Sequence, residues 1–499
     1  MFLGIDCGTQ GTKALILDAA HGRVLGQGSA PHDMISAANG RREQDPAQWV
    51  EALELAVQRA LAVAGIDGKD IQGIGVSGQQ HGLVLLDDRG KVLRPAKLWC
   101  DTETTPENDR LLALLGGPKG SLARLGVVIA PGYTVSKLIW TQEQFPHVFR
   151  DIDKILLPHD YLNFWLTGRA CTDYGDASGT GYFDVRQRRW DLHLLREIDP
   201  TGRLQASLPE LIESEQPVGR ILPEIAERLG INPQALVASG GGDNMMGAIG
   251  TGNIQAGELT MSLGSSGTLF GYSDEPIASE EGLIANFCSS SGGWLPLICT
   301  LNMTNATGAV RSLFDLDLAA FNERVEHAPI GAGDVMMLPF FNGERVPALP
   351  HATGSIHGLT TTNLTQANLC RAAVESTTFG LRYGLDLLQA NGVQGHNIRL
   401  VGGGARSAVW RQIIADIMNM PVICAEEPEA AALGAAIQAA WCVGQHHPTP
   451  VSLAQLCKRC ARLDNKTLTL PVEANVSAYR QVYSQYRQHL ATIESEGHP

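Results

Sequence analysis

A glycine-rich turn between two apolar strands occurs twice in this sequence, about half a chain apart. The first copy has apolar runs at residues 2–5 and 14–17 around the turn at residues 7–12, and the second copy spans residues 259–270. The copies align Gly8 with Gly264, Thr9 with Ser265, Gly11 with Gly267 and Thr12 with Thr268. This repeat predicts an internal duplication, in which two similar α/β domains face each other across a deep cleft.

The chain is long enough for this arrangement, because 499 residues exceed what one hydrophobic core usually organises. Apolar periodicity and turn residues predict helices at about 45–63, 368–388 and 430–442, and strands at 71–77, 235–238 and 397–401. We therefore expect a first domain over residues 1–250, a second domain over residues 251–445 and a helical tail over residues 446–499.

Charge and cysteine usage narrow the classes of partner. The net charge is -14 and the 38 Lys and Arg residues form no basic run, so we expect no nucleic-acid partner. No leader and no apolar stretch of about 18 residues is seen, so we expect no membrane partner. The ten cysteines are scattered, which indicates reduced thiols and a cytoplasmic location. No Gly-x-Gly-x-x-Gly follows the first strand, so a dehydrogenase is a poor fit.

The two turns are candidate phosphate sites. Backbone N–H groups of a short glycine turn can converge on one anion, and hydroxyl and amide side chains add donors. One such hairpin is common in ordinary sheets, but two opposed copies could bracket a polyphosphate such as that of ATP. The candidates are Gly8, Thr9, Gln10, Gly11 and Thr12 with the cation Lys13 nearby, and Gly264, Ser265, Ser266 and Gly267.

Asp6 breaks the symmetry of the repeat, because Ser262 stands at the matching position. A duplicated fold needs its turn twice, whereas a carboxylate that holds Mg²⁺ is needed once. We therefore expect Asp6 to be the metal-side residue. The alternative is an aspartate that hydrogen-bonds within the turn.

Asp243 is the candidate general base. It follows a predicted strand and the run Gly240-Gly241-Gly242, and small residues that predict a helix come after it. A carboxylate at that place can accept the proton of a sugar hydroxyl as its oxygen attacks phosphorus. By residue type alone, an aspartate that caps the helix is the simpler interpretation. The context decides between the two.

Three further residues are suited to sugar and one segment to a nucleoside. Gln80 and His81 at a strand end offer donors and acceptors for hydroxyl groups, and Trp99 offers an apolar face. The strand-to-helix turn at residues 402–407 is a place where a nucleoside could lie against bare backbone. None of these residues alone would predict a binding site, but together they support one.

From about residue 2 to residue 444 the sequence resembles the FGGY carbohydrate kinases of the actin-like ATPase superfamily. Residues 354–359 (GSIHGL), followed by 368–375 (NLCRAAVE), are similar to one family signature at every constrained position. Residues 132–140 (GYTVSKLIW) are similar to the other, with Thr141 where an aliphatic residue is usual. The resemblance implies two duplicated actin-like (ribonuclease H-like) α/β domains.

Within the family, four segments are most similar to members that phosphorylate D-xylulose: 77–82 (SGQQHG), 156–162 (LLPHDYL), 176–180 (DASGT) and 343–347 (GERVP). Glycerol-specific members have Arg-Glu in place of Gln80-His81. The resemblance implies transfer of the ATP γ-phosphoryl group to the 5-hydroxyl of D-xylulose, with Asp243 as base and Mg²⁺ as cofactor. It also implies that Asn244 joins the sugar contacts, and that Gly403, Gly404 and Ser407 hold the nucleoside.

Two alternatives stay open. A kinase for another pentulose, a polyol or an aldonate would share every motif except the sugar contacts. An actin-like or chaperone-type ATPase would share both phosphate turns and the cleft, but it would need neither the sugar contacts nor Asp243. The oligomeric state is also open, and a homodimer is one option.

Overall fold

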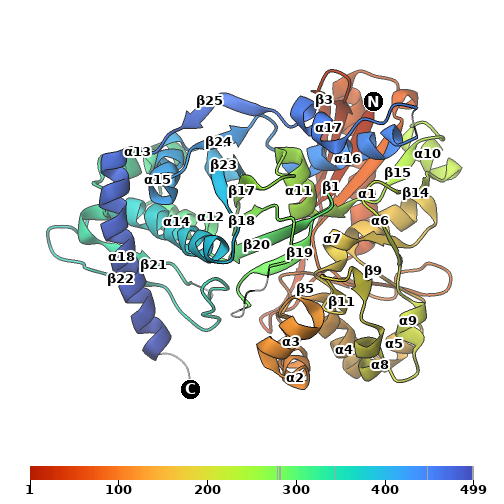
Figure 1. Ribbon diagram of the computed structural model, residues 1–499, viewed down its shortest axis with the longest axis horizontal. Coiled ribbons are helices and arrows are strands. Elements are labelled where there is room, and N and C mark those ends of the chain that lie inside the picture. Colours follow the sequence, from red (N-terminus) through yellow and green to blue (C-terminus); the bar gives the residue numbers. More distant parts are fainter. Residues whose placement is uncertain (278, 280–281, 342, 447, 497–499) are drawn as a thin grey trace.

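The computed structural model describes residues 1–277, 279, 282–341, 343–446 and 448–496, and it consists of two lobes that lie side by side (Figure 1). Each lobe is built on a mixed sheet with helices packed against it. The fold is therefore mixed α/β with two domains, as the repeated turn predicts.

The first sheet carries the first glycine turn, between two of its antiparallel strands. Its order is β14 (Pro217–Arg220), β15 (Leu236–Ala238), β6 (Gly73–Gly78), β1 (Phe2–Cys7), β2 (Gly11–Asp18), β3 (Arg23–Pro31), and β16 (Gly241–Gly242) also pairs with β6. Helix α1 (Pro46–Ala64) covers β2 and β3. Its ends follow from local chemistry, because the Asp45 side chain accepts a hydrogen bond from the Ala47 N–H and Gly65 takes a left-handed cap.

The second sheet carries the second turn and repeats six strands of the first sheet in the same order. Its order is β19 (Ala285–Cys288), β20 (Trp294–Thr300), β18 (Gly267–Gly271), β17 (Gly257–Leu263), β23 (Gly395–Val401), β24 (Val422–Ala425), β25 (Leu463–Thr469). The strands β1, β2, β3, β6, β15 and β14 correspond to β17, β18, β20, β23, β24 and β25 in neighbour and in direction. This correspondence confirms the duplication.

Helix α16 (Ala430–Gly444) follows β24 in sequence but packs on β1 and β6 of the first sheet. The contact is close, since a Cβ on Gly4 would lie 1.9 Å from the Ala432 carbonyl oxygen and one on Gly75 2.0 Å from that of Ala435. Helix α11 (Asp243–Thr251) crosses α16 equally closely, at Gly250 and Gly434. Small residues at these places let the two helices join the lobes.

A long insertion completes the first lobe and lies at the lower right of Figure 1. Its strands are β4 (Ile35–Ser36), β5 (Arg42–Gln44), β7 (Val84–Leu86), β8 (Ala96–Lys97), β9 (Lys154–Leu156), β10 (Cys171–Asp173), β11 (Phe183–Asp184), β12 (Arg189–Trp190) and β13 (Glu210–Ile212). Its helices are α2 (Thr105–Leu114), α3 (Gly117–Leu125), α4 (Thr134–Gln144), α5 (Pro146–Arg150), α6 (Pro158–Thr167), α7 (Tyr174–Ala177), α8 (Leu192–Ile198) and α9 (Arg203–Ala206). Helix α10 (Pro223–Leu229) follows β14, contacts α1 and lies at the upper right of Figure 1.

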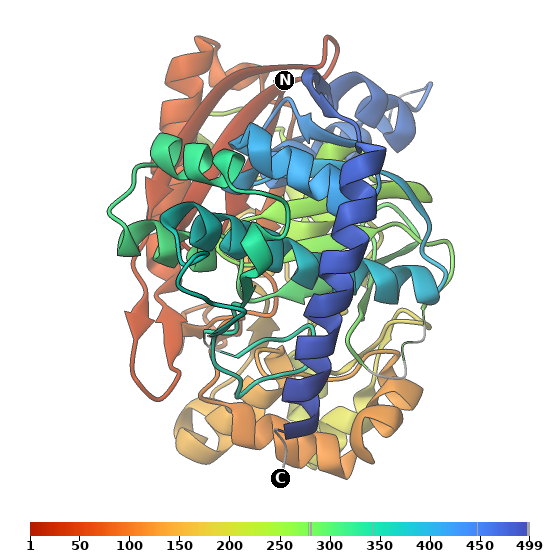
Figure 2. The ribbon, with the colours of Figure 1, turned by 90° about the vertical axis from the view of Figure 1, so that its left-hand side faces the viewer.

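The second lobe has its helices on the outside of its sheet, with α18 running along its surface (Figure 2). They are α12 (Thr304–Leu313), α13 (Leu318–His327), α14 (Gln366–Ala390), α15 (Ala408–Met418) and α18 (Glu473–Glu496), with a small ribbon of β21 (Met336–Leu338) and β22 (Ser355–His357). No helix among the described residues is long and apolar enough to cross a bilayer.

The tail differs from the helical segment that the sequence predicts. It contains α17 (Leu453–Cys460) and α18, but β25 lies between them and pairs antiparallel with β24. The strand has the polar sequence LDNKTLT at the edge of the sheet, so its conformation depends on pairing with β24 and not on an apolar pattern. All ten cysteines are free thiols, as predicted.

Candidate active site

Parallel strand ends bring the predicted residues of the first lobe to one edge of its sheet. β6 lies between β1 and β16, with Ser77 opposite both Asp6 and Gly241. Gln80 and His81 continue from β6, and Asp243 continues from β16. Because the carboxyl ends of parallel strands meet at the same edge, the predicted metal-side, sugar-side and base residues converge there.

Asp243 is the first residue of α11, and Gly242 occupies the capping position. The aspartate therefore does not cap the helix. Its Oδ1 accepts hydrogen bonds from the backbone N–H and the Nδ2 of Asn244, at 2.8 and 3.0 Å. Burial, with the negative charges of Asp6 and Asp176, raises the pKa of Asp243 to about 7. A carboxylate poised near neutral pH suits proton transfer.

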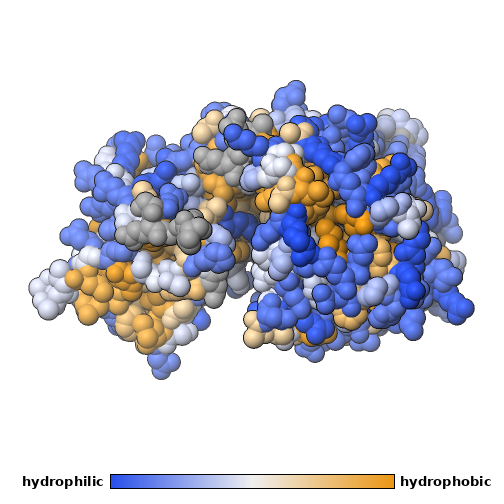
Figure 3. Space-filling view, turned by 90° about the horizontal axis from the view of Figure 1, so that it is seen from below, coloured by the Kyte–Doolittle hydropathy of each residue, from blue (hydrophilic) through white to orange (hydrophobic). Residues whose placement is uncertain are grey.

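A cavity lies between the lobes, where Figure 3 shows the surface hollowed when it is seen from below. All five predicted sugar-side residues line it, and so do two residues of the second turn. These lining residues are Gln80, His81, Trp99, Asp243, Asn244, Gly264 and Ser266. The predicted base, the predicted sugar contacts and part of the second predicted phosphate turn therefore line one cavity.

Some of the lining residues carry buried polar atoms without hydrogen-bond partners in the described part of the chain. Gln80 accepts a hydrogen bond from Asn244 Nδ2 at 2.9 Å, but its own Nε2 has no partner among the described residues. The Nδ1 of His81 is also buried without a partner there. Burial lowers the pKa of His81 well below its ordinary value, so the ring is neutral and can both donate and accept. In proteins, buried polar groups of this kind usually complete their hydrogen bonds with a ligand or with ordered water.

Glycines of the two predicted phosphate turns and of the predicted nucleoside turn are of two kinds. A Cβ on Gly8, Gly264 or Gly403 would meet open space or no atom closer than 3.3 Å. A Cβ on Gly11 would lie 2.6 Å from the Ala30 carbonyl oxygen, and one on Gly267 2.7 Å from Met303 Cε. The first three leave backbone bare for a ligand, whereas the last two let the strands pack.

The turns share a sequence layout but not a register. In the first hairpin Cys7 pairs with Thr12, and in the second Leu263 pairs with Gly267, so the second turn is one residue shorter. The start of α12 supports the second turn, because Thr304 donates to the Gly264 carbonyl through its N–H and its hydroxyl at 3.0 and 2.7 Å.

Side chains of the first turn are tied to its surroundings. The Thr9 hydroxyl accepts a hydrogen bond from Trp99 Nε1 at 2.9 Å and donates to Gln79 Oε1 at 3.1 Å. Gln10 is exposed at the tip of the turn, and Thr12 is buried. Because Trp99 also lines the cavity, one indole ring connects the cavity with the first turn.

Asp6 and Lys13 have partners within the protein. Asp6 Oδ1 accepts a hydrogen bond from the Ser77 hydroxyl at 2.8 Å. Burial raises the pKa of Asp6, and the Ser77 hydroxyl and the Lys13 ammonium oppose that rise. Lys13 itself is ion-paired with Glu429 at the start of α16. The predicted phosphate cation thus has a carboxylate partner already.

The predicted nucleoside turn follows β23, which is parallel to β17, the strand that leads into the second turn. The two turns are therefore neighbours at one sheet edge. Gly404 packs against Leu263 and Trp410, while Gly403 is open. The Ser407 hydroxyl caps α15 and donates to Asn322 Oδ1 at 2.8 Å, so it is already hydrogen-bonded.

The lining residues that were not predicted as site candidates include Tyr133, Phe287 and Arg345. The side chain of Arg345 pairs with no carboxylate among the described residues, and its charge helps to lower the pKa of His81. Tyr133 and Arg345 lie in the segments 132–140 and 343–347, which the sequence offers only as marks of resemblance. Their position in the cavity follows from the fold.

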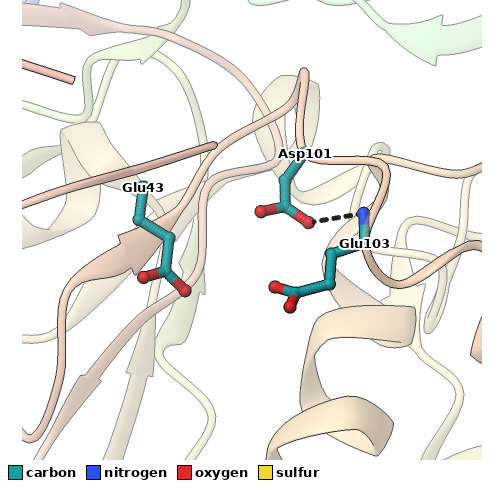
Figure 4. A group of neighbouring side chains, drawn as sticks. All are labelled: Glu43, Asp101 and Glu103. Atoms are coloured by element: carbon teal, nitrogen blue, oxygen red, sulfur yellow. Dashed lines mark hydrogen bonds between the residues drawn. The ribbon is translucent and has the colours of Figure 1, made fainter. Parts of the chain in front are cut away.

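Glu43, Asp101 and Glu103 lie close enough to hold a metal ion (Figure 4). The ammonium of Lys97 occupies that place instead, at 3.0 Å from Asp101 Oδ2, 2.5 Å from Glu103 Oε2 and 3.4 Å from Glu43 Oε1. Arg41 and Arg94 also pair with Glu43. Three cations therefore balance the three carboxylates, and the cluster needs no metal.

The two lobes and their shared cavity define a two-domain phosphotransferase of the carbohydrate kinase class. The model of the N-terminal domain of the FGGY family of carbohydrate kinases matches residues 1–250, and that of the C-terminal domain matches residues 259–443. The chain belongs to the FGGY family of carbohydrate kinases, and ATP is the phosphoryl donor that this family implies.

The names of similar proteins are consistent with this family assignment. Xylulose kinase of Haemophilus influenzae is 50% identical over 497 residues, which cover 99% of this chain and 100% of the relative. The crystal structure of a xyloylose kinase from Brucella ovis has a TM-score of 0.91 at 31% identity and covers 99% of this chain and 100% of that one. A gluconate kinase from Lactobacillus acidophilus has a TM-score of 0.88 at 25% identity, covering 98% and 97%.

Proposed function

We propose that this protein is a xylulose kinase, which transfers the γ-phosphoryl group of ATP to the 5-hydroxyl of D-xylulose. The observation that carries this proposal is the position of Asp243, with a pKa of about 7, in a cavity that it shares with Gln80, His81 and the second turn. The full-length likeness to the Haemophilus influenzae xylulose kinase supports the choice of sugar.

Asp243 would act on the hydroxyl that becomes phosphorylated. The carboxylate accepts the hydroxyl proton, the oxygen forms a bond to the γ-phosphorus, and the bond from that phosphorus to the bridging oxygen breaks to release ADP. Gln80, through its unpartnered Nε2, and His81, through the part of its imidazole that lines the cavity, would bind other hydroxyls and hold the sugar in place. Both side chains line the cavity, so they can form hydrogen bonds to a sugar that lies inside it.

ATP would extend from the first turn past the second turn to the glycines after β23. Bare backbone at Gly8, Gly264 and Gly403 supports this path. The Ser407 hydroxyl would contact the nucleoside beside its bond to Asn322. Arg345 would face the transferred group with a cation that no carboxylate of the described residues neutralises.

We further propose that Asp6 is the residue nearest the metal. A partly buried carboxylate with one oxygen held by Ser77 and a raised pKa fits a group that a cation would stabilise in its charged form. Mg²⁺ would neutralise charge on the phosphates there. Lys13, held by Glu429, would remain beside the first turn as a weaker source of positive potential.

The substrate is tested by measuring ADP release with a panel of sugars: D-xylulose, D-ribulose, L-ribulose, glycerol, xylitol and gluconate. We expect D-xylulose to give the highest kcat/KM. Turnover with gluconate or another sugar and none with D-xylulose would refute the proposed substrate and leave the kinase class intact. ATP hydrolysis that needs no sugar would instead favour a chaperone-type ATPase.

A further inference from the structure

The segment 132–140 has no role in the site described so far, although it resembles a family signature. It forms the loop before α4 and the first turns of that helix. Lys137, on α4, is completely buried. Its Nζ donates hydrogen bonds to the carbonyl oxygens of Gly132 and His81, the latter at 2.6 Å. A side chain from this helix therefore reaches the backbone of a sugar-side residue.

His81 has a backbone that needs such support. Its φ is 64°, in the left-handed region, which is unfavourable for a residue with a side chain. Its carbonyl oxygen also accepts a hydrogen bond from the Thr134 hydroxyl at 3.2 Å. Conformations of this kind persist only when surrounding contacts hold them, and here two side chains of α4 hold one carbonyl group.

The imidazole ring of His81 is confined as closely as its backbone. Its centroid lies 4.9 Å from that of Tyr133 and 5.5 Å from that of Phe287. On the remaining side, a Cβ on Gly179 would lie 1.9 Å from ring atoms of His81. The ring is therefore confined on three sides, with its Nδ1 and Cε1 against Gly179, and the backbone conformation at residue 81 decides how the rest of the ring faces the cavity.

We infer that Lys137 is a positioning residue for sugar binding, which fixes the left-handed conformation of His81 so that its imidazole faces the sugar. The inference rests on the proposed function, in which His81 contacts the sugar. Lys137 lies behind His81 and does not line the cavity, so its effect passes through the His81 carbonyl.

A lysine suits this role because two carbonyl oxygens are the acceptors. Among the described residues, no carboxylate lies within ion-pair distance of Lys137, so its hydrogen bonds to the backbone are its main polar contacts. Burial lowers the pKa of Lys137 to about 7, and both the neutral and the charged amine carry at least two hydrogens for two acceptors. Arginine has a wider planar group and would not fit the same space.

The test is a double-mutant cycle on the KM for D-xylulose, with Lys137→Met, His81→Ala and the double variant. We expect Lys137→Met to raise this KM about tenfold or more while the KM for ATP changes little. In the His81→Ala background the same substitution should change the KM for sugar less than about twofold, because its target is gone. Thr141→Val is the control, since the Thr141 hydroxyl donates to the Lys137 carbonyl on the same helix without reaching His81.

Each outcome separates the inference from the proposed function. If His81→Ala leaves the KM for every sugar unchanged, the proposed sugar site is wrong. If His81→Ala raises the KM but Lys137→Met adds its full factor in that background, only the positioning role is refuted. Equal effects of Lys137→Met and Thr141→Val would refute it too.

Should Lys137→Met fail to fold, Lys137→Gln takes its place in the cycle, since it keeps a polar side chain too short to reach both carbonyls. Gly179→Ala gives an independent check from the other side of the ring. It should raise the KM for sugar in the wild type and lose that effect beside His81→Ala. Persistence of the full effect there would contradict a defined position for the ring.

Discussion

The raised pKa of Asp243 predicts opposite changes in activity and stability when the residue becomes Asn. Burial raises this pKa from 3.8 to about 7, which corresponds to a preference for the neutral acid of about 4 kcal/mol. Between those two pH values the folded protein holds a proton that the unfolded chain releases, so stability falls as the pH rises from about 4 to about 7. Above pH 7 the whole cost of ionisation is present.

Asp243→Asn removes that cost. We expect the variant to be more stable than the wild type at pH 8, by up to about 4 kcal/mol, and to show no gain near pH 4. Urea unfolding of the free proteins at both pH values measures the difference. A variant that is less stable than the wild type at pH 8 would refute the reasoning, because it would mean that the carboxylate stabilises the fold.

The same titration governs turnover. Only ionised Asp243 can accept a proton, so kcat/KM for the sugar should fall about tenfold for each pH unit below 7 and reach a plateau above it. Asp243→Asn should lower kcat by about 10²–10⁴-fold and remove this dependence. A wild-type profile that is flat from pH 5.5 to 8, or near-normal turnover of the variant, would show that another group is the base.

Four further substitutions test other parts of the protein. Gly8→Ala should leave the melting temperature unchanged and raise the KM for ATP, whereas Gly11→Ala should lower the stability by about 1–3 kcal/mol, because its Cβ meets the Ala30 carbonyl oxygen; thermal melts and ATP kinetics would distinguish the two. Arg345→Met should lower kcat at saturating ATP at least about tenfold, and an unchanged kcat would place this cation outside the reaction. Lys97→Met should destabilise the protein by about 3–5 kcal/mol in urea unfolding, since it leaves buried carboxylates without their shared cation; equal stability would contradict this.

Local signals predicted much of the fold. Helix α1 was predicted at residues 45–63 and runs over Pro46–Ala64, because the Asp45 cap and Gly65 mark its ends in the sequence itself. The repeated turn predicted two equivalent sheets, and the strand orders confirm it. Strand β25 was missed, because it is polar and forms by pairing with β24 about 40 residues earlier in the chain.

The site was predictable where one short segment carries the chemistry, and not where several segments meet. Gln80, His81, Asp243 and Asn244 stand at strand ends or helix starts, and the fold brings all of them to the cavity. Arg345 reaches the cavity from a loop about 100 residues after Asp243, and nothing in its own segment indicates that neighbour. Ser407 was predicted as a nucleoside contact, a role that stays a prediction, whereas its function as a helix cap is visible only in the structure.

The duplication explains why one carboxylate can be the base. Helix α11 follows β15 and β16, and helix α16 follows β24, the strand that corresponds to β15. Each helix begins at or beside an acidic residue, which is Asp243 for α11 and Glu429 for α16. Glu429 lies beside the first turn and is ion-paired with Lys13. Asp243 lines the same cavity as the second turn. Beside that turn, Ser262 and Thr268 stand at the positions equivalent to Asp6 and Thr12. Asp243 has no cationic partner among the described residues. Burial without a cationic partner raises the proton affinity of a carboxylate, as it does for Asp243. The two halves therefore share a scaffold, and the described residues place no counterpart of the Lys13 ion pair beside Asp243, which supports the proposal that Asp243 exchanges a proton.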